Sequence, residues 1–527
     1  MAGYFLANNF IKRMSLITTR DTRYSAFHKI VDSITDELQD MIWLGESKPR
    51  RRLKGEHLNK LKYSVEKLVR DSVAIKHSPK RKALASIHLG RERYKASTYN
   101  TMLTYRIHVE RCFEGMIEIG YLRLEKKGYH DPAGNRFLTR YSATSKLLNK
   151  FPAKLSKALP VFIPQDRDDN IIRVQETFKK MVKGKEVKAK RLVEYQETSE
   201  TKLMRDNLNK INTTLSHYWF DLRLDDEDFV AMQDSMLSKK QRDAGTDRQL
   251  NLSKRNMYRV FNDAEMTLGG RFYGGWWQEV PKGYRHYIVM NAKPMVEFDY
   301  ANLHPRILYA EAGLTPPDDC YSGIYPEFTE GLMPPNSSLR KTVKIALNAM
   351  LNATKPLNRP PRGFRKSDCN CSWKDLCEAI LKKHQPIADK FFTGQGLRLQ
   401  RIDSEIAEYV MLHFAKHDMP ILPLHDSFLI RSGYEETLEQ VMQEAFYHLV
   451  GSDVGIEEKK MALPNTMNKD ERRVWDKVQA QRANNKPNTL SIYELLAYTE
   501  TGHEKRLDTF FSLPRSTKKF QERQHIH

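Results

Sequence analysis

The sequence has little cysteine and no long apolar segment. Five Cys in 527 residues are too few for a disulfide-linked scaffold, which favours a reducing compartment. No stretch approaches the roughly 20 apolar residues that a transmembrane helix needs, and the first residues lack the continuous apolar run of a secretory signal. We therefore expect a soluble protein in the cytoplasm, with no membrane partner.

Acidic residues are also in short supply relative to basic ones. The chain has 87 Lys and Arg against 66 Asp and Glu, a formal net charge of +21. A surplus of this size is typical of proteins that bind a polyanion, either a nucleic acid or an anionic membrane surface. Hydrophobic residues make up 40% of the chain, which excludes a wholly disordered protein. Nucleic acid is the partner that we expect.

Composition and pattern divide the chain into four regions. Residues 1–165 are basic and mostly helical in pattern, and residues 166–254 are highly charged and indicate a helical arm or thumb-like region. Residues 255–465 are richer in apolar and aromatic side chains and contain sharp motifs, whereas residues 466–527 form a basic tail. The length allows about three domains.

The first region contains a predicted helix followed by a basic hairpin. An apolar stripe runs through residues 97–120, and two alternating segments then flank a turn at residues 131–135. This order is the shape of a winged helix, with Lys126, Lys127 and Arg136 available for phosphates. A generic helix and hairpin without a nucleic-acid role is the alternative. The basic run at residues 179–191 suggests either a solvated linker or a helical arm that grips a duplex.

Two aspartates stand at predicted strand ends. The alternation before Asp299 predicts a strand, and the residues after it predict a helix that stops at Gly313. In residues 420–430, two apolar half-strands flank Asp426 in a tight hairpin. A lone Asp at such a place is more often a helix cap. Two of them on one sheet could hold two divalent ions that bind a triphosphate and activate a hydroxyl nucleophile.

A third segment predicts an amphipathic helix at residues 337–355. A polar line follows one side at intervals of four residues: Arg340, Lys344, Asn348 and Asn352. Alone, this line is a solvated basic face. Beside two acidic metal ligands, Arg340 and Lys344 could clamp a triphosphate, with Lys344 as a proton donor to the leaving pyrophosphate.

These three segments resemble motifs A, B and C of the family A DNA polymerase superfamily, in the same order. DYANLHPRILYAEAG, beginning at Asp299, is similar to the family pattern DYSxIELRxLAHxxG, and RKTVK is similar to the start of its fingers helix. LHDSF resembles the family's VHDE and, more closely, the HDSF of single-subunit phage-type RNA polymerases. The resemblance covers roughly residues 255–435.

The resemblance implies an α+β fold of the right-hand polymerase type, with palm, fingers and thumb. It implies a DNA-directed DNA polymerase that extends a primer with dNTPs, using two Mg²⁺, or Mn²⁺ in their place, held by Asp299 and Asp426. Two weaker matches, GGRFYGGWWQEVP and LQRIDSEIA, extend it to primer and template contacts. The residues in those implied contacts are Arg271, Gln278 and Gln400 of these two matches, together with His425 of LHDSF.

The sequence also departs from the family pattern at the positions that select the sugar. His304 stands where DNA polymerases have a Glu gate against a 2′-hydroxyl and RNA polymerases a small residue, so it favours dNTPs. Asn352 stands where the family has a Tyr, and either Asn348 or Asn352 could bind a ribose hydroxyl, which favours NTPs. An RNA polymerase or primase-like enzyme, and a catalytically degenerate DNA-binding replication initiator, are the alternatives.

The cysteines near residue 370 do not form a typical zinc motif. The one-residue and five-residue gaps among Cys369, Cys371 and Cys377, with His384 beyond, suit a tetrahedral site poorly, so we do not expect zinc. The cluster Phe272, Tyr273, Trp276 and Trp277 could stack on bases or pack beneath a sheet.

The basic tail contains EKRLDTFF, which resembles a sliding-clamp-binding peptide. Leu507, Phe510 and Phe511 would enter the apolar pocket of such a clamp.

Overall fold

The protein is described here from a computed structural model. The described residues are 22–41, 51–76, 83–130, 136–152, 170–182, 185–216, 218, 220–224, 226–237, 250–252, 254–290, 293–324, 338–369 and 371–459.

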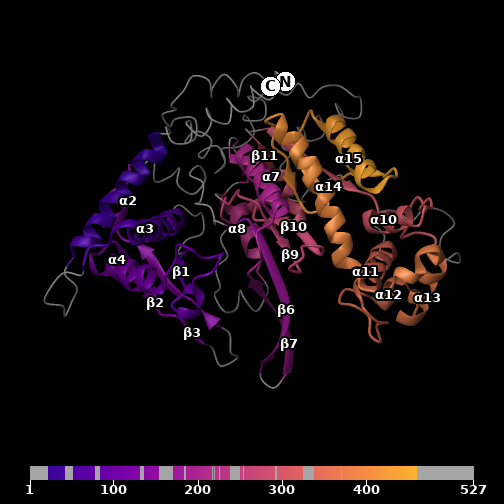
Figure 1. Ribbon diagram of the computed structural model, residues 1–527, viewed down its shortest axis with the longest axis horizontal. Coiled ribbons are helices and arrows are strands. Elements are labelled where there is room, and N and C mark those ends of the chain that lie inside the picture. The colour runs from indigo at the N-terminus through magenta and orange to yellow at the C-terminus, as the bar shows by residue number, and fades with distance from the viewer. Residues whose placement is uncertain are drawn as a thin grey trace.

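An N-terminal unit has its own hydrophobic core. Its elements are α2 (Thr22–Asp40), α3 (Gly55–Lys76), β1 (Ala85–Ile87), η1 (Arg91–Tyr94), η2 (Tyr105–Phe113), α4 (Glu114–Glu118), β2 (Leu122–Lys126), β3 (Tyr129–His130), β4 (Arg136–Phe137), β5 (Thr139–Ala143) and α5 (Ser145–Leu148). Apolar stripes on α2, α3 and η2 pack together against a three-stranded antiparallel sheet of order β1-β5-β2. This unit lies to one side of the molecule (Figure 1).

The predicted helix and hairpin of the first region are confirmed. η2 continues into α4, and β2 then pairs with β5 around the inner strands β3 and β4. Lys126 and Lys127 are exposed on this hairpin. The side chain of Arg136 lies outside the described part of the chain. A nucleic-acid role for the hairpin stays a prediction.

The rest of the described chain contains three groups of elements. The first group is β6 (Ile172–Val182), β7 (Lys185–Val193), α7 (Ser199–Ser216), β8 (Phe220–Leu222) and α8 (Asp226–Ser235). The second is β9 (Tyr258–Phe261), β10 (Gly269–Tyr273), η3 (Trp276–Glu279), η4 (Lys282–Tyr287), β11 (Ile288–Met290), β12 (Lys293–Tyr300) and α10 (Leu303–Glu311). The third is α11 (Ser338–Asn352), α12 (Lys366–Cys369), α13 (Trp373–Lys383), η6 (Gln385–Lys390), α14 (Gly396–Lys416), β13 (Leu422–Pro423), β14 (Ser427–Arg431), α15 (Glu435–Val450) and β15 (Ile456–Glu458).

The expectation of a helical arm at residues 179–191 is wrong. β6 and β7 form a long antiparallel hairpin there, which extends away from the rest of the molecule (Figure 1). The alternation of Val187 and Ala189 with lysines has the period of a strand, and its high charge concealed that period. β6 continues into a four-stranded sheet of order β10-β9-β6-β7. One hydrophobic core runs from Ile171 to Val454, so the boundary predicted at residue 254 is not a break in packing.

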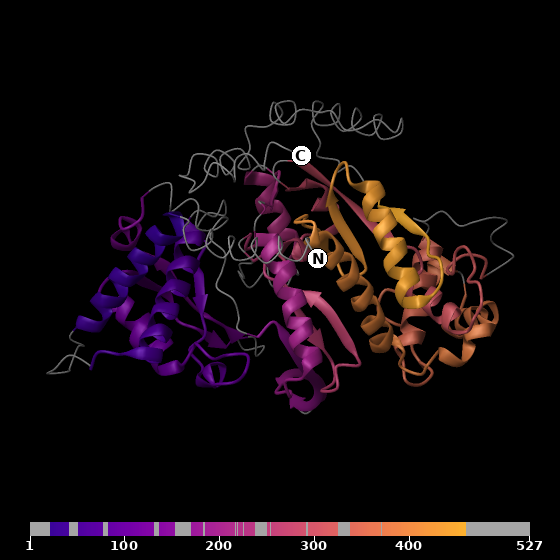
Figure 2. The same ribbon diagram turned by 45° about the horizontal axis from the view of Figure 1, so that its top comes forward.

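A second sheet carries the motif segments. Its strand order is β13-β14-β12-β11-β8, with β15 pairing to β12. Helix α14 packs on strand β10 of the four-stranded sheet and on α7, α10, α11 and α15, so it joins that sheet to the helices around it (Figures 1 and 2). The mixed α+β prediction is confirmed, whereas the palm, fingers and thumb layout stays a prediction. Among the described residues, no helix is long and apolar enough to cross a membrane. The cytoplasmic location also stays a prediction.

Candidate active site

Asp299 and Asp426 lie next to each other on the second sheet. β12 pairs with β14 in an antiparallel register that sets Asp299 opposite Ser427, the residue after Asp426. The β13–β14 hairpin turns at His425, whose φ of +73° lies in the left-handed region. Burial and then the negative charge of Asp426 raise the pKa of Asp299 above its ordinary value. The negative charge of Asp426 therefore acts on an Asp299 side chain that is only 15% exposed.

The strands fold this way because both are apolar on the faces that meet the core. Val296 and Phe298 of β12 are buried, as are Phe428 and Ile430 of β14. Buried Glu297 accepts a hydrogen bond from Ser427 Oγ at 3.0 Å and pairs with Arg285 at 3.3 Å. A slip of one residue would turn these side chains to the wrong face, so the register is fixed.

Lys459 belongs to the same site, and the sequence did not reveal it. Its backbone N–H donates to Glu297 O at 2.8 Å, which prolongs the β15–β12 pairing. Its Nζ then lies 2.6 Å from Oδ2 of Asp299. Burial lowers the pKa of Lys459, but the charge and hydrogen bond of Asp299 outweigh burial, and the pKa is raised. Oδ1 of Asp299 is buried and has no hydrogen-bond partner among the described residues.

Helix α11 forms as predicted and brings Lys344 to the carboxylates. The Lys344 side chain is exposed, and its charge acts on Asp299. Its Nζ lies 5.6 Å from the ring centroid of Tyr321. Arg340 is held in two hydrogen bonds by Asp319, at 2.8 and 3.0 Å. Lys344 is therefore presented to the site, while Arg340 is neutralised by a carboxylate that the sequence did not flag.

Of the two asparagines of α11, Asn352 is engaged within the protein, whereas a nucleotide contact by Asn348 stays a prediction. Asn352 donates to the backbone O of Asn348 at 2.7 Å, one turn back along the helix. It also packs against Gly396 of α14, where a Cβ would lie 1.8 Å from Asn352 Oδ1. Asn352 thus closes the end of α11 against α14, and the expected ribose contact has no support for this residue.

A second charged group surrounds Asp403, whose side chain is fully buried. Arg271 Nε donates to it at 3.1 Å, and His304 Nε2 lies 3.0 Å from its Oδ2. The charge of Asp426 acts on Arg271, so this group adjoins the paired carboxylates. The sequence could have indicated Asp403, because it is a carboxylate on the apolar stripe of α14 between Leu399 and Ile406.

The remaining predicted contact residues lie along the border of this region. Gln278 donates to the backbone O of Phe272 and of Pro423, so it braces the hairpin. Gln400 precedes Asp403 by one helical turn and shares its side of α14. His425 Nδ1 is buried with no hydrogen-bond partner among the described residues. Burial and the charge of Arg271 lower the pKa of His425.

The aromatic cluster divides between core and surface. Trp276 and Trp277 are fully buried, and Phe272 is nearly so, which excludes base stacking by these three residues. Trp277 Nε1 donates to Pro423 O at 3.0 Å, which satisfies its polar atom. Tyr273 is half-buried and open to a cleft.

His384 packs inside the protein. Its Nδ1 lies 3.1 Å from the Tyr309 hydroxyl, and its Nε2 lies 2.9 Å from the backbone O of Cys320. The described residues contain no group of three or more metal-ligating side chains. The expectation about zinc stays a prediction. Leu507, Phe510 and Phe511 lie outside the described residues.

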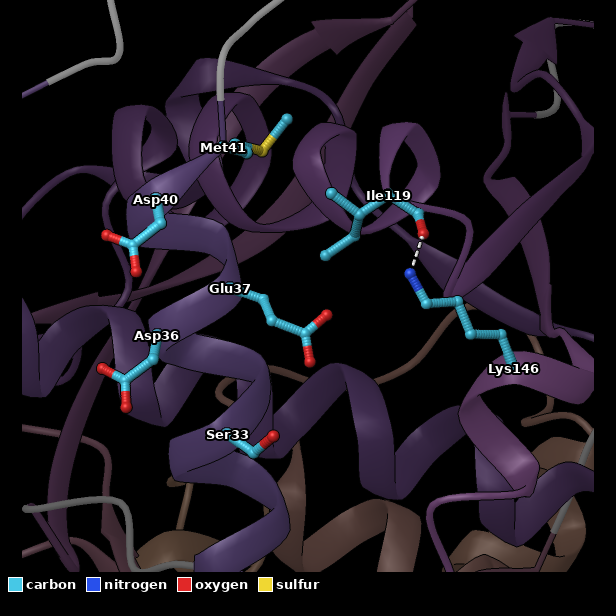
Figure 3. Close-up of a pocket in the computed structure, with 7 residues that line it drawn as sticks. All are labelled: Ser33, Asp36, Glu37, Asp40, Met41, Ile119 and Lys146. Atoms are coloured by element: carbon cyan, nitrogen blue, oxygen red, sulfur yellow. Dashed lines mark hydrogen bonds between the residues drawn. The ribbon is translucent and has the colours of Figure 1, made fainter.

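An open, acidic hollow lies on the N-terminal unit and is lined by none of the motif residues; Figure 3 shows the residues that line it. Asp36, Glu37 and Asp40 of α2 line it, together with Lys146, whose Nζ donates to Ile119 O at 2.7 Å. Arg52 pairs with both aspartates, at 3.5 and 2.7 Å. The carboxylates are already compensated, so this hollow does not compete with the paired Asp299 and Asp426 as the candidate site.

No protein-family model matches the chain, and no curated protein matches it. The chain is similar to a solved structure, the POL domain of Pol1 from M. smegmatis in complex with DNA primer-template and dNTP. The identity is 11% and the TM-score 0.28, over 82% of this chain and 65% of that one, which is less than two thirds of its length. A TM-score this low carries no argument, and the proposal below depends on the geometry of the site.

Replacing Lys459 by Met should destabilise the protein. The change leaves Asp299, whose side chain is 15% exposed, beside Asp426 without its cation. Removing one member of a buried pair is strongly destabilising, and this pair is partly solvated, so we expect a loss of about 2 to 3 kcal/mol in urea unfolding. The matched control is Lys179→Met, which breaks the exposed pair with Glu186 and should cost at most about 1 kcal/mol. Equal losses in the two variants would contradict the role of Lys459.

Proposed function

We propose that this protein is a template-directed nucleotidyltransferase, a DNA polymerase that extends a primer 3′-hydroxyl with dNTPs. The observation that carries the proposal is the pair of carboxylates, Asp299 on β12 and Asp426 directly before β14, with the charge of Lys344 acting on Asp299. The negative charge of Asp426 opposes the ionisation of Asp299, so nearby cations stabilise the pair, and Lys459 is one such cation. A site of this kind is stable and useful when cations bind in it.

The residues fit divalent cations. Asp299 offers a buried oxygen without a hydrogen-bond partner, and the nearby charge of Asp426 provides the second carboxylate. Oxygen ligands of this type suit Mg²⁺ and Mn²⁺. When bound, the ions would lower the pKa of the attacking hydroxyl and offset the charge on the transferring phosphoryl group. The Lys459 ammonium now pairs with Oδ2 of Asp299. It would move away from that oxygen when a divalent cation binds there.

The other residues position the triphosphate. The chemistry is attack of the primer 3′-hydroxyl on the α-phosphorus, with the α–β phosphoanhydride bond breaking and pyrophosphate leaving. Lys344 is exposed, cationic and near Asp299, so its ammonium suits the phosphates and can give a proton to the leaving pyrophosphate. Arg340 can bind the triphosphate only when its hydrogen bonds to Asp319 are broken.

The sugar is selected by His304 in this proposal. Its imidazole is hydrogen-bonded to the Asp403 carboxylate, and the same carboxylate accepts a hydrogen bond from Arg271. A ring fixed at both its backbone and its Nε2 cannot move aside for a 2′-hydroxyl, so the site favours dNTPs over NTPs. Asn352 was expected to favour NTPs by binding a ribose hydroxyl. Its side chain instead hydrogen-bonds to the backbone O of Asn348 and packs against Gly396.

Neutralising either paired carboxylate should abolish nucleotide incorporation. Asp299→Asn and Asp426→Asn should each reduce the rate of primer extension by about 1,000-fold or more, because several kcal/mol of transition-state stabilisation are lost. The measurement is extension of a labelled primer on a DNA template with dNTPs and Mg²⁺. Asp453→Asn, an exposed acid just before β15, is the matched control and should leave the rate unchanged. Near-normal extension by either site variant would refute the assignment of that residue.

Releasing His304 should relax the choice of sugar. His304→Ala removes a steric overlap worth roughly 1 to 3 kcal/mol, so the ratio of NTP to dNTP incorporation should rise by about 5- to 100-fold. Asp403→Asn should shift the ratio in the same direction by a smaller factor, because the ring loses its charged anchor. Asp403→Glu, which keeps a carboxylate, should restore part of the selectivity. A wild-type preference for NTPs, or a ratio unmoved by both changes, would favour the RNA polymerase alternative.

A further inference from the structure

A cleft separates the N-terminal unit from the sheet that carries β9 and β10. Its volume is about 510 Å³, and helix α3 contributes Tyr63 and Lys67 to one wall. Tyr258 of β9 and Tyr273 of β10 form the opposite wall, and His425 of the motif hairpin closes one end. The cleft therefore leads to the residue that precedes Asp426.

The sheet wall of this cleft is a continuous row of aromatic and cationic groups. The Arg173 guanidinium lies 3.7 Å from the ring centroid of Tyr258. Tyr258 stacks on Tyr273 with centroids 6.1 Å apart and planes at 28°. Tyr273 meets the ring of His425 edge-on at 5.2 Å. We name these four residues, from Arg173 to His425, the ladder.

The backbone beside the ladder packs closely against the Tyr258 ring, which requires glycine at position 274. Gly274 has a φ of +114°, which side chains of L-residues rarely adopt, and a Cβ there would lie 2.4 Å from Asn256 O and 2.9 Å from the Tyr258 ring. Tyr258 and Tyr273 are half-buried, so their rings are partly available to a ligand.

The charge of the cleft is positive. Lys67, Arg173, Lys254 and Arg255 line it, against one carboxylate, Glu279, which pairs with Lys254 at 3.4 Å. Arg255 is buried and donates to the backbone O of Tyr218 at 2.8 Å; burial lowers its pKa to about 10, and the charge of Asp221 acts in the opposite direction. Cations beside stacked aromatic rings are the combination that binds single-stranded nucleic acid, with phosphates on the cations and bases on the rings.

The two walls are held together by specific bonds. The Tyr99 hydroxyl, from the N-terminal unit, donates to Val193 O at 2.7 Å and accepts from the Val174 N–H at 3.1 Å. The Thr98 N–H donates to the Glu194 carboxylate at 3.0 Å. These bonds tie the N-terminal unit to β6 and β7, so α3 remains opposite the ladder.

We propose that this cleft binds a single strand of DNA whose unpaired bases stack on Tyr258 and Tyr273, with its phosphates at Lys67 and Lys254. The cleft has the size of a site for one small ligand, which suits unpaired nucleotides and excludes a base-paired duplex. The inference deepens the proposed function and rests on it for the direction of the strand, whose end nearest His425 enters the active site. The N-terminal unit then forms part of the DNA-binding surface of the enzyme.

The test is the affinity of the full chain for a fluorescent oligodeoxythymidylate of about 12 nucleotides, measured by anisotropy without dNTP or divalent cation. Tyr258→Ala and Tyr273→Ala should each weaken binding by about 5- to 100-fold, the loss of one stacked base. Tyr258→Phe and Tyr273→Phe keep the ring and should bind as the wild type does. Tyr447→Ala removes an exposed tyrosine of α15 and is the matched control. A blunt duplex of the same length should bind more weakly than the single strand and should respond little to the ladder variants.

Lys67→Gln tests the cleft independently if a ladder variant fails to fold, because Lys67 lies on α3 and is not part of the ladder. It should weaken binding and reduce the dependence of affinity on salt. Unchanged affinity in Lys67→Gln and in the folded alanine variants would overturn the proposal, as would equal binding of duplex and single strand. Asp426→Asn should bind the oligonucleotide normally. The wild-type chain could show no polymerase activity while the ladder variants still lose oligonucleotide binding. That combination would support the binding cleft and refute only the proposed function.

Discussion

The pairing of β12 with β14 is the interaction on which the site depends. It brings Asp426 beside Asp299, and burial together with the negative charge of Asp426 raises the pKa of Asp299. The protein tolerates this because β15 adds a third strand on the other side of β12 and places the Lys459 ammonium against Asp299. The hydrophobic faces of β12 and β14 provide the stability that this repulsion opposes.

A buried carboxylate organises the neighbouring region in the same way. Asp403 holds Arg271 of β10 and His304 of α10, which are far apart in the sequence. Because one acid holds both groups, the strand that would contact a primer and the helix that follows Asp299 are mechanically linked. Arg259 of β9 makes a parallel connection to Glu408 and Ser404 of the same helix, α14. Helix α14 is thus the element against which both sides of the site are aligned.

Local patterns in the sequence predicted much of this arrangement. The alternation before Asp299, the Gly313 helix stop and the His425 hairpin are short-range signals, and each was confirmed. The helix that carries Lys344 was also predicted from its apolar stripe. The sequence did not predict Lys459 or Asp319, because their partners are set by tertiary pairing and no local period marks them. The β6–β7 hairpin was missed because its lysines masked the two-residue period of the strands, which the pairing of β6 with β7 reveals.

Diffraction from crystals of the protein grown with Mn²⁺, a primer-template and a non-hydrolysable dNTP analogue tests the central claim most directly. The anomalous signal of manganese marks its position without reference to activity. Paired carboxylates that bind divalent cations predict strong peaks between Asp299 and Asp426, with the Lys459 ammonium displaced from Asp299 and the triphosphate beside Lys344. A map without manganese at these carboxylates, with Lys459 still paired to Asp299 and the nucleotide bound elsewhere, would contradict the account.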